Sequence, residues 1–332
     1  MSYKLASSSW GEEELKAIQR VIKSDRFSMG SEVTAFEEDF AAWHNVKYGV
    51  MVNSGSSANL ISIASLFHKN IKPLKRGDEV IVPAISWSTT YYPLQQYGLK
   101  IKFVDVEIDS FNIDVTKLED ALTPQTKLII AVSILGNPAA LDQIKNFAVD
   151  HGLYFMEDNC ESLGAELPDN SKTGTFGDLN TFSFFFSHHI ATMEGGMVLT
   201  NDEELFHLLR SMRNHGWTRD LPQPSKIYEE SEDDFFEAYR FILPGYNVRP
   251  IEMAGAIGRE QLKKLPDFIQ KRRRNLFIFQ NLFGTDRRFV IQKEYGKSSA
   301  FSFPLVLNPE LNPKRKKILQ ALKKAGVEYR II

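Results

Sequence analysis

The sequence predicts an α/β fold, with a mostly parallel central sheet covered by helices on both faces and a smaller α+β domain after it. Short apolar segments alternate with helical patterns from residue 48 to residue 213, as in chains built from βαβ units. The 332 residues, 43% of them hydrophobic, are enough for a large core and a second smaller one. We place the large domain at residues 1–244 and the small domain at 245–332, with residues 1–30 packing on the latter.

Composition excludes several classes of protein. A net charge of −2 gives no basic field for nucleic acid or an anionic membrane. The single cysteine, Cys160, allows neither an internal disulfide nor a four-cysteine zinc or iron–sulfur cluster, so we expect no metal. The first residues show no apolar leader, and no segment is long enough to span a membrane. These features predict a cytoplasmic protein.

Hydrophobic periodicity predicts the elements in order. Those before residue 180 are a helix over 10–24 capped by Ser8 or Ser9, a helix over 32–43, strand 48–52, helix 60–67, strands 79–83 and 102–106, helix 115–121, strand 127–133, helix 142–150 and strand 153–156. Those after it are strands 182–186 and 197–200, helix 202–213, a surface loop over 214–234, a helix over 252–283 broken at Pro266, strand 300–307 and helix 313–325.

The segment 181–200, TFSFFFSHHIATMEGGMVLT, is the most informative part of the chain. It is predicted to be a strand, an exposed turn and a second strand. The turn holds two adjacent imidazoles, His188 and His189, and side chains on a turn between buried strands are well placed for chemistry.

Polar side chains follow several other predicted strands. Ser54–Ser57 lie between a strand and a helix, where backbone N–H groups can bind phosphate, although an ordinary helix cap explains them equally well. Trp87, Asn137 and Asp158 also follow strands, and strand ends line the ligand crevice of an open parallel sheet. A carboxylate, a flat aromatic ring and a phosphate loop suit a flat, nitrogen-containing, phosphorylated cofactor. Taken singly, Trp87 could be core and Asp158 a helix N-cap.

Four segments carry a family resemblance: SMGSEVTAFEEDFAAWHNVKYGVMVNSGSSAN, GDEVIVPAISWSTT, EDNCESLGA and GYNVRPIEMAGAIGREQL. In this order, and together with shorter matches from about Trp10 to about Arg330, the chain resembles the DegT/StrS-type sugar aminotransferase and dehydratase family. The resemblance implies the fold type I of pyridoxal-phosphate-dependent transferases, related to aspartate aminotransferase. It also implies pyridoxal or pyridoxamine 5'-phosphate as the cofactor.

The resemblance implies roles for individual residues. Those expected to bind the cofactor are Gly55, Ser56 and Ser183 at the phosphate, Trp87 on the ring, Asp158 at the ring nitrogen, Glu161 near the ring hydroxyl, and Asn247 at the phosphate of the neighbouring subunit. The last implies a homodimer with shared active sites. Candidates for contacts with the substrate are Gly30, His215, Arg219 and Arg330.

One departure from the family pattern changes the expected reaction. Aminotransferases of this family have a Schiff-base lysine where His188 stands, and no lysine lies between Lys172 and Lys226. An imidazole forms no Schiff base but moves protons near neutral pH. The SHHIATMEGG stretch resembles the family branch of sugar 3-dehydratases. This implies that His188 is the base whose proton abstraction leads to expulsion of the C3 hydroxyl of a GDP- or CDP-linked 4-keto-6-deoxyhexose, with glutamate as amine donor. The alternatives are a nucleotide-sugar aminotransferase and an inactive binding protein.

The C-terminal end differs from the family as well. Family chains usually continue for a few dozen residues beyond the segment that resembles residues 326–330, and complete the small domain and one wall of the sugar pocket. The small domain is therefore expected to be short here. The usual family context is the biosynthesis of deoxysugars for surface polysaccharides and lipopolysaccharide O-antigen.

Overall fold

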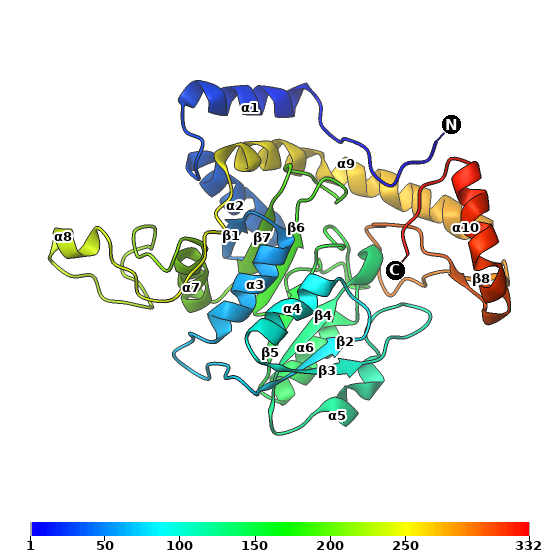
Figure 1. Cartoon of the computed structure of the whole chain (residues 1–332), viewed down its shortest axis with the longest axis horizontal. Helices are drawn as coiled ribbons and strands as arrows, with labels where there is room; N and C mark the ends of the chain where they lie inside the picture. The colour runs from blue at the N-terminus through cyan, green and yellow to red at the C-terminus, as the bar shows by residue number, and fades with distance from the viewer. Residues whose placement is uncertain (1, 332) are drawn as a thin grey trace.

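A seven-stranded sheet lies at the centre of the computed structural model, which describes residues 2–331 (Figure 1). Its strand order is β1-β7-β6-β5-β4-β2-β3, and only β7 runs antiparallel to its neighbours. The strands are β1 (Tyr48–Val52), β2 (Glu79–Pro83), β3 (Lys100–Val104), β4 (Thr126–Val132), β5 (Tyr154–Asp158), β6 (Leu179–Ser183) and β7 (Gly196–Thr200). The predicted α/β fold with a mostly parallel sheet is confirmed.

Helices cover both faces of this sheet. They are α1 (Glu12–Ser24), α2 (Ser31–His44), α3 (Gly55–Leu66), α4 (Ser88–Gln96), α5 (Leu118–Ala121), α6 (Leu141–Asp150), α7 (Glu203–Arg213), α8 (Asp234–Glu237), α9 (Glu252–Phe283) and α10 (Arg315–Lys324). Short 3-10 turns occur at Val115–Lys117, Ile134–Gly136 and Pro309–Lys314. A two-stranded antiparallel sheet, β8 (Phe289–Val290) and β9 (Val306–Leu307), accompanies α10.

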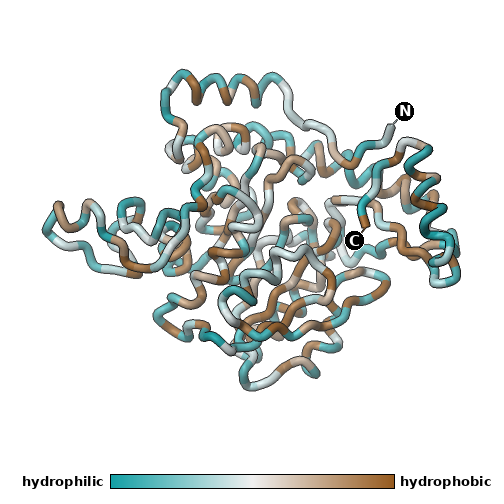
Figure 2. The backbone as a smooth tube through the Cα atoms, in the orientation of Figure 1, coloured by the Kyte–Doolittle hydropathy of each residue, from teal (hydrophilic) through white to brown (hydrophobic). Residues whose placement is uncertain are grey.

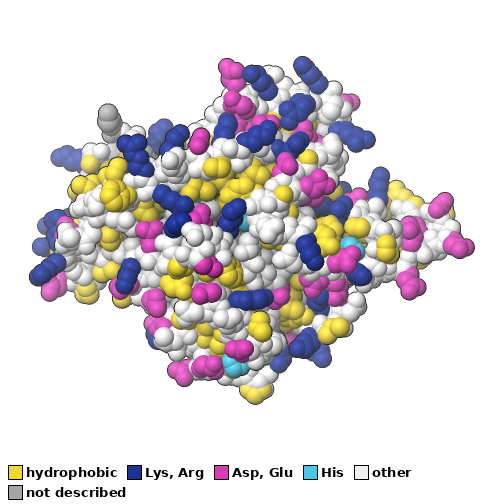
Figure 3. Space-filling view, turned by 180° about the vertical axis from the view of Figure 1, so that it is seen from behind, with side chains coloured by type: hydrophobic (Ala, Val, Ile, Leu, Met, Phe, Trp, Pro, Cys, Tyr) yellow, Lys and Arg dark blue, Asp and Glu magenta, His cyan; other side chains and the backbone are white. Residues whose placement is uncertain are grey.

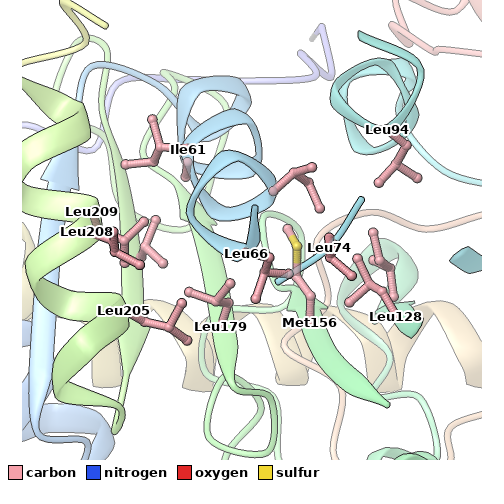
Figure 4. Close-up of a cluster of buried hydrophobic side chains, with 14 of the residues drawn as sticks. Ile61, Leu66, Leu74, Leu94, Leu128, Met156, Leu179, Leu205, Leu208 and Leu209 are labelled. Carbon is pink, nitrogen blue, oxygen red and sulfur yellow. The ribbon is translucent and has the colours of Figure 1, made fainter. Parts of the chain in front are cut away.

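Alternation along the strands explains how the two faces are filled. In β2, Val80 and Val82 join the cluster under α3 and α7, whereas Ile81 joins the cluster on the α6 side. Figure 4 shows the first cluster, in which leucines of α7 meet the strands and α3. Buried residues therefore occupy nearly every position of the central strands, and those of β2 and β4 are mostly apolar (Figure 2), as a sheet buried on both faces requires.

The phosphate-loop segment differs from its prediction. Helix α3 begins at Gly55 rather than residue 60, and Ser54 caps it by accepting the N–H of Ser57 at 3.1 Å. Helix α4, predicted as loop, begins directly after Trp87. Serine and threonine disfavour helix interiors by propensity, but they are favoured in the first turn, where their hydroxyls satisfy free N–H groups.

The predicted break at Pro266 is wrong, because α9 continues through it. A proline removes one backbone hydrogen bond of the helix, and the flanking Leu262, Leu265 and Ile269 pack into the cluster shared with α2. Tertiary packing of that face therefore outweighs the local cost of the proline.

Three smaller predictions are also wrong. The strand expected over 182–186 ends at Ser183, and the strand expected over 300–307 is reduced to β9. The N-cap of α1 is Gly11, whose N–H is bonded by Glu14, and Ser9 instead donates to Gln261. In each case, the apolar or hydroxyl residue that suggested the prediction makes its contact with a distant segment instead of within the expected element.

The N-terminal segment lies beside the C-terminal part of the chain (Figure 1). Helix α1 packs on α9, and Tyr3 pairs with Val327. The chain between α7 and α9 extends sideways as an arm that carries α8. The division into domains at residue 244 stays a prediction. Among residues 2–331, no helix combines the length and apolar character that crossing a bilayer requires.

Candidate active site

The candidate site lies where parallel strands end at one edge of the sheet. Strands β5 and β6 end at Asp158 and Ser183, and β1 leads directly into Ser54 and Gly55. Because β5 and β6 are adjacent and parallel, their carboxyl ends open on the same crevice. The topology therefore brings together residues that are more than a hundred positions apart.

Gly55 and Ser183 form a close-packed cradle at the start of α3. A Cβ added to Gly55 would lie 2.5 Å from Ser183 Cβ and 3.0 Å from Cys160 Sγ, so only glycine fits. The N–H groups of a helix's first turn have no partner inside the helix and carry a positive partial charge. Ser56, exposed beside them, donates its hydroxyl to Thr89 at 2.9 Å. This combination can accept an anion.

Asp158 is a buried carboxylate with its hydrogen bonds in place. Oδ2 accepts from Asn59 Nδ2 at 2.9 Å and from Thr90 Oγ1 at 2.8 Å, and Oδ1 accepts from Cys160 N at 3.1 Å. Its side chain is oriented from α3 and α4 together, which is the preorganisation that a charge partner for a cofactor needs. The N-cap reading of Asp158 is not what the structure shows, because no helix begins after it.

Trp87 and Asn137 behave differently from each other. Trp87 is 67% exposed at the N-cap of α4, so its ring is not part of the core. Asn137 is fully buried: its Nδ2 donates to Ser110 O and Lys293 O, and its Oδ1 accepts from Tyr295 N. The expectation that Asn137 lines the ligand crevice is wrong, because its amide already ties the chain before α6 to Lys293 and Tyr295.

The two histidines are not on an exposed turn, contrary to the prediction. His189 is 2% exposed and His188 is half-buried, and the Nδ1 atoms of both rings are buried with no hydrogen-bond partner in residues 2–331. Burial first, and then the guanidinium groups of Arg272 and Arg330, lower the pKa of His188 from 6.5 to about 4. Burial also lowers the pKa of His189 well below its ordinary value. Both imidazoles are therefore neutral at pH 7.

Distant segments hold the histidine turn in place. The indole Nε1 of Trp10 donates to Ala191 O at 2.9 Å, and Gln261 Oε1 accepts from Ala191 N at 3.2 Å. His189 Nε2 lies 3.2 Å from Ser299 O. Contacts from α9, the N-terminal segment and the segment around Ser299 thus fix a turn that has no regular structure of its own.

Glu161 interacts electrostatically with Asp158 and Arg330, and it forms a hydrogen bond with the backbone of Leu135. Its Oε2 accepts from Leu135 N at 2.8 Å. Burial, and secondarily the Asp158 carboxylate, raise the pKa of Glu161 from 4.5 to about 7 against the opposing effects of the Leu135 N–H and Arg330. A carboxyl group with this pKa can hold or release a proton near neutral pH.

We expect Glu161 to make folding stability pH-dependent. Because its pKa is raised in the folded state, the folded protein binds the proton more tightly, and stability should fall as pH rises from about 4.5 through about 7. Glu161→Gln, which keeps the acceptor for Leu135 N–H, should flatten this slope in urea denaturation. Glu310→Gln on an exposed turn is the control, and an unchanged slope in Glu161→Gln would contradict the assignment.

The remaining candidates have local contacts. Asn247 is exposed, and its Oδ1 accepts from Arg249 Nε at 3.1 Å. His215 and Arg219 are exposed after α7, with the Arg219 guanidinium 5.1 Å from the Trp217 ring. The N–H of Gly30 donates to Glu252 at 2.6 Å. Of the four substrate candidates, only Arg330 acts electrostatically on both Glu161 and His188.

Sequence reasoning missed four residues that shape the site. They are Asn59 and Thr90, which hold Asp158, and Leu135 and Phe301, which adjoin Glu161 and His188. Asn59 and Thr90 stand within the quoted motifs and could have been noticed there. Leu135 and Phe301 carry no sequence signal, because an apolar residue at a site resembles any core residue.

The residues present fit a phosphorylated pyridine cofactor. Added side-chain volume at Gly55 would fill the anion cradle, Asp158 is an oriented carboxylate, and Trp87 exposes a flat ring. His188 presents a half-buried imidazole whose Nδ1 is buried and has no hydrogen-bond partner among residues 2–331. Fold and site together define an α/β enzyme of the fold type I, pyridoxal-phosphate-dependent class.

A family model agrees with this class. The model of the DegT/DnrJ/EryC1/StrS aminotransferase family matches residues 8–332, and the chain belongs to this family. The predicted resemblance is confirmed.

Individual relatives are similar over the whole chain. GDP-4-keto-6-deoxy-D-mannose 3-dehydratase of Yersinia pseudotuberculosis is 53% identical over 100% of this chain and 84% of its own length. A crystal structure of GDP-4-keto-6-deoxymannose-3-dehydratase with a trapped PLP-glutamate geminal diamine is 51% identical with a TM-score of 0.96, over 99% of this chain and 86% of that chain. Helicobacter pylori PseC, an aminotransferase involved in the biosynthesis of pseudoaminic acid, is 28% identical with a TM-score of 0.86, over 98% of this chain and 83% of that chain.

Proposed function

We propose that the protein is a pyridoxal-phosphate-dependent 3-dehydratase of a GDP-linked 4-keto-6-deoxyhexose. In the net reaction the sugar loses the oxygen of its C3 hydroxyl, and glutamate is oxidised to 2-oxoglutarate with release of ammonia. The sugar loses one oxygen atom, and 2-oxoglutarate contains one more oxygen atom than glutamate. The reduction of the sugar therefore balances the oxidation of glutamate, and no further oxidant or reductant is needed. Support comes from relatives that are named for this activity and from the adduct of cofactor and glutamate in one of them.

One observation carries the choice of dehydration over amination. The turn after β6 holds His188, and no lysine occurs between Lys172 and Lys226. A primary amine is needed to bind the cofactor covalently and to end an amino-transfer cycle. An imidazole instead serves as a general base, and burial keeps it neutral and able to accept a proton at pH 7.

The side chains around the crevice divide the binding of the cofactor among them. Gly55, Ser56 and Ser183 would bind its phosphate, Trp87 would stack on its ring, and Asp158 would keep a proton on its ring nitrogen. When bound, the cofactor supplies an electron sink for bond breaking next to the sugar's C4. Glu161 lies beside Asp158 and, with its raised pKa, holds a proton near the ring hydroxyl.

His188 first accepts a proton, and this proton transfer precedes loss of the C3 hydroxyl. The protonated imidazole then donates a proton to the departing oxygen. A neutral imidazole suits the first step, and the imidazolium formed by it suits the second. The positive charge of Arg330, which already acts on His188 and Glu161, favours an anionic or electron-rich substrate group at this place.

A homodimer with shared sites is part of this proposal. The arm between α7 and α9 carries exposed aromatic side chains, including Phe235 at 92% and Tyr239 at 74% exposure. Figure 3 shows hydrophobic and acidic side chains on this arm, which projects from the main body. Exposed aromatic groups of this size are typical of protein–protein contacts. Asn247, exposed where the arm returns to α9, would reach the phosphate in the second subunit.

The decisive experiment mixes the full chain with pyridoxal phosphate and glutamate. The absorbance of the aldehyde form should give way to that of the amine form, and a GDP-linked 4-keto-6-deoxyhexose should then lose its C3 hydroxyl, as followed by mass spectrometry. Nitrogen retained on C4 of the product would contradict dehydration. A CDP-linked sugar turned over faster than the GDP-linked one would contradict the proposed nucleotide.

Asp158→Asn tests the cofactor site separately from the sugar chemistry. The amide keeps the size of the carboxyl group, but it loses the charge that stabilises a protonated ring nitrogen. A hydrogen bond to a charged group is worth about 1.5–3 kcal/mol, so the amine form should appear roughly 10- to 150-fold more slowly with glutamate. Asp169→Asn, at an exposed turn, is the matched control. Equal rates in Asp158→Asn and the unchanged protein would contradict the role of Asp158.

A further inference from the structure

The proposed base is oriented in an unusual way. A catalytic or metal-binding histidine usually has one ring nitrogen bonded to a carboxylate or a backbone carbonyl, which fixes the ring. The Nδ1 of His188 is buried and has no such partner in the part of the chain that the structure describes, residues 2–331. Within these residues, packing rather than a hydrogen bond at Nδ1 therefore orients this imidazole.

Two phenylalanine rings lie against the imidazole. The ring centroids of His188 and Phe301 are 5.1 Å apart with an angle of 70° between the planes, and those of His188 and Phe185 are 6.0 Å apart at 87°. Both are edge-to-face arrangements, which are favourable and directional for aromatic rings. Phe185 precedes His188 in the same turn, whereas Phe301 comes from a segment more than a hundred residues later.

The backbone that carries Phe301 is held firmly. The N–H of Phe301 donates to Leu135 O at 3.0 Å, and Arg272 Nη1 donates to the carbonyls of Ala300 at 3.1 Å and Phe301 at 3.3 Å. The neighbouring imidazole of His189 lies 3.2 Å from Ser299 O. Because these hydrogen bonds fix its backbone, Phe301 can orient the imidazole of His188.

Backbone strain marks the same place. Ala300 and Leu135 both have left-handed conformations, with φ of 50° and 56°, although neither is glycine. Such conformations cost about 1–3 kcal/mol each and persist where surrounding contacts impose them, often at functional sites. Leu135 donates its N–H to Glu161 and accepts from Phe301. It thus links the carboxyl group on one side of the crevice to the ring that contacts His188.

We propose that Phe301 is a positioning residue that holds the imidazole of His188 in its working orientation, and that Leu135 ties this ring to Glu161. The proposal rests on the proposed role of His188 as the base. Phe301 also shields the imidazole from water, beside the charged or titratable groups that act on it, namely Arg272, Arg330 and His189. An aromatic residue here replaces the hydrogen-bond partner that orients most catalytic histidines.

The test compares variants of the full chain without substrate and with it. Phe301→Leu removes the ring while keeping an apolar side chain, Phe301→Met is a second variant with different packing, and Phe301→Tyr restores a ring. Phe303→Leu is the matched control, because Phe303 lies two residues away and stacks on Phe279 instead. NMR titration of the histidine rings, with His188→Asn used to assign the signal, reports on the imidazole in the absence of any turnover.

In Phe301→Leu and Phe301→Met, we expect the pKa of His188 to move up from about 4 towards 6.5 as water enters, and kcat to fall about 10- to 100-fold with little change in KM. Phe301→Tyr should bring both the pKa of His188 and kcat most of the way back to those of the unchanged protein. Phe303→Leu should change neither quantity.

An unchanged His188 titration in folded Phe301→Leu and Phe301→Met would overturn the proposal, as would an equal loss of kcat in Phe303→Leu. These results differ from a failure of the proposed function. If His188→Asn kept full activity, His188 would not be the base, yet the titration would still show whether Phe301 holds its ring.

Discussion

His188→Asn should lose sugar dehydration while keeping cofactor binding. Asparagine is polar and fits the space, but it has no group that accepts a proton near neutral pH. General acid–base catalysis contributes about 10²- to 10⁴-fold, and a loss of this size is expected in the rate of 3-deoxy product formation, measured by mass spectrometry. The absorbance change with glutamate should still show cofactor bound in the site.

His151→Asn is the matched control for this change. His151 follows α6 and lies 3.2 Å from Glu119, in contact with none of the candidate site residues by any hydrogen bond or ion pair found in residues 2–331. It should leave turnover within about twofold, because surface substitutions have small effects. Full dehydration activity in His188→Asn would rule out His188 as the base.

Arg213→Leu should cause the largest loss of stability. The guanidinium is 1% exposed at the end of α7, where Nη1 donates to the Glu37 carboxylate and, at 2.7 Å, to Met51 O. Glu37 Oε1 in turn accepts the N–H of Met51 at 2.7 Å. Removing the arginine takes away the ion-pair partner of the buried Glu37 carboxylate, which costs about 3–5 kcal/mol in the free energy of unfolding.

Urea denaturation of the full chain measures this loss. Arg288→Leu removes an exposed ion pair with Asp286 and should cost less than about 1 kcal/mol. Replacing Glu37 and Arg213 together by leucine should recover part of the stability, because no buried charge then remains. A cost below about 1 kcal/mol for Arg213→Leu would contradict the buried ion pair. Met51 belongs to the strand that leads into Gly55, so weaker cofactor binding should accompany the loss.

Regular elements and the sheet's direction were predictable from local pattern. Apolar segments of β-strand length, separated by amphipathic helices, require a parallel sheet buried on both faces, and the structure has one. Errors occurred where local and tertiary preferences compete. Helix α9 passes through Pro266 because its buried face packs on α2, and α3 begins at Gly55 because serine hydroxyls cap its first turn.

The candidate site was predictable where the type of a residue and its position after a strand together indicate its chemistry. Asp158 and Gly55 follow predicted strands, Ser183 lies within one, and their convergence follows from the parallel sheet. Asn137 occupies a similar position in the sequence, but its amide is used up by bonds to Ser110, Lys293 and Tyr295. Strand-end position alone does not distinguish a ligand-binding side chain from one that joins two parts of the chain.

By itself, the sequence determined that an imidazole stands where the family's aminotransferases have a lysine, since the presence or absence of a primary amine is a property of the side chain alone. Only the tertiary structure decided that this imidazole is half-buried, neutral and oriented. These properties depend on Phe301, Arg272 and Arg330, which come from segments far along the chain. A pKa depends on the water and charges that surround a group, and folding alone brings those together.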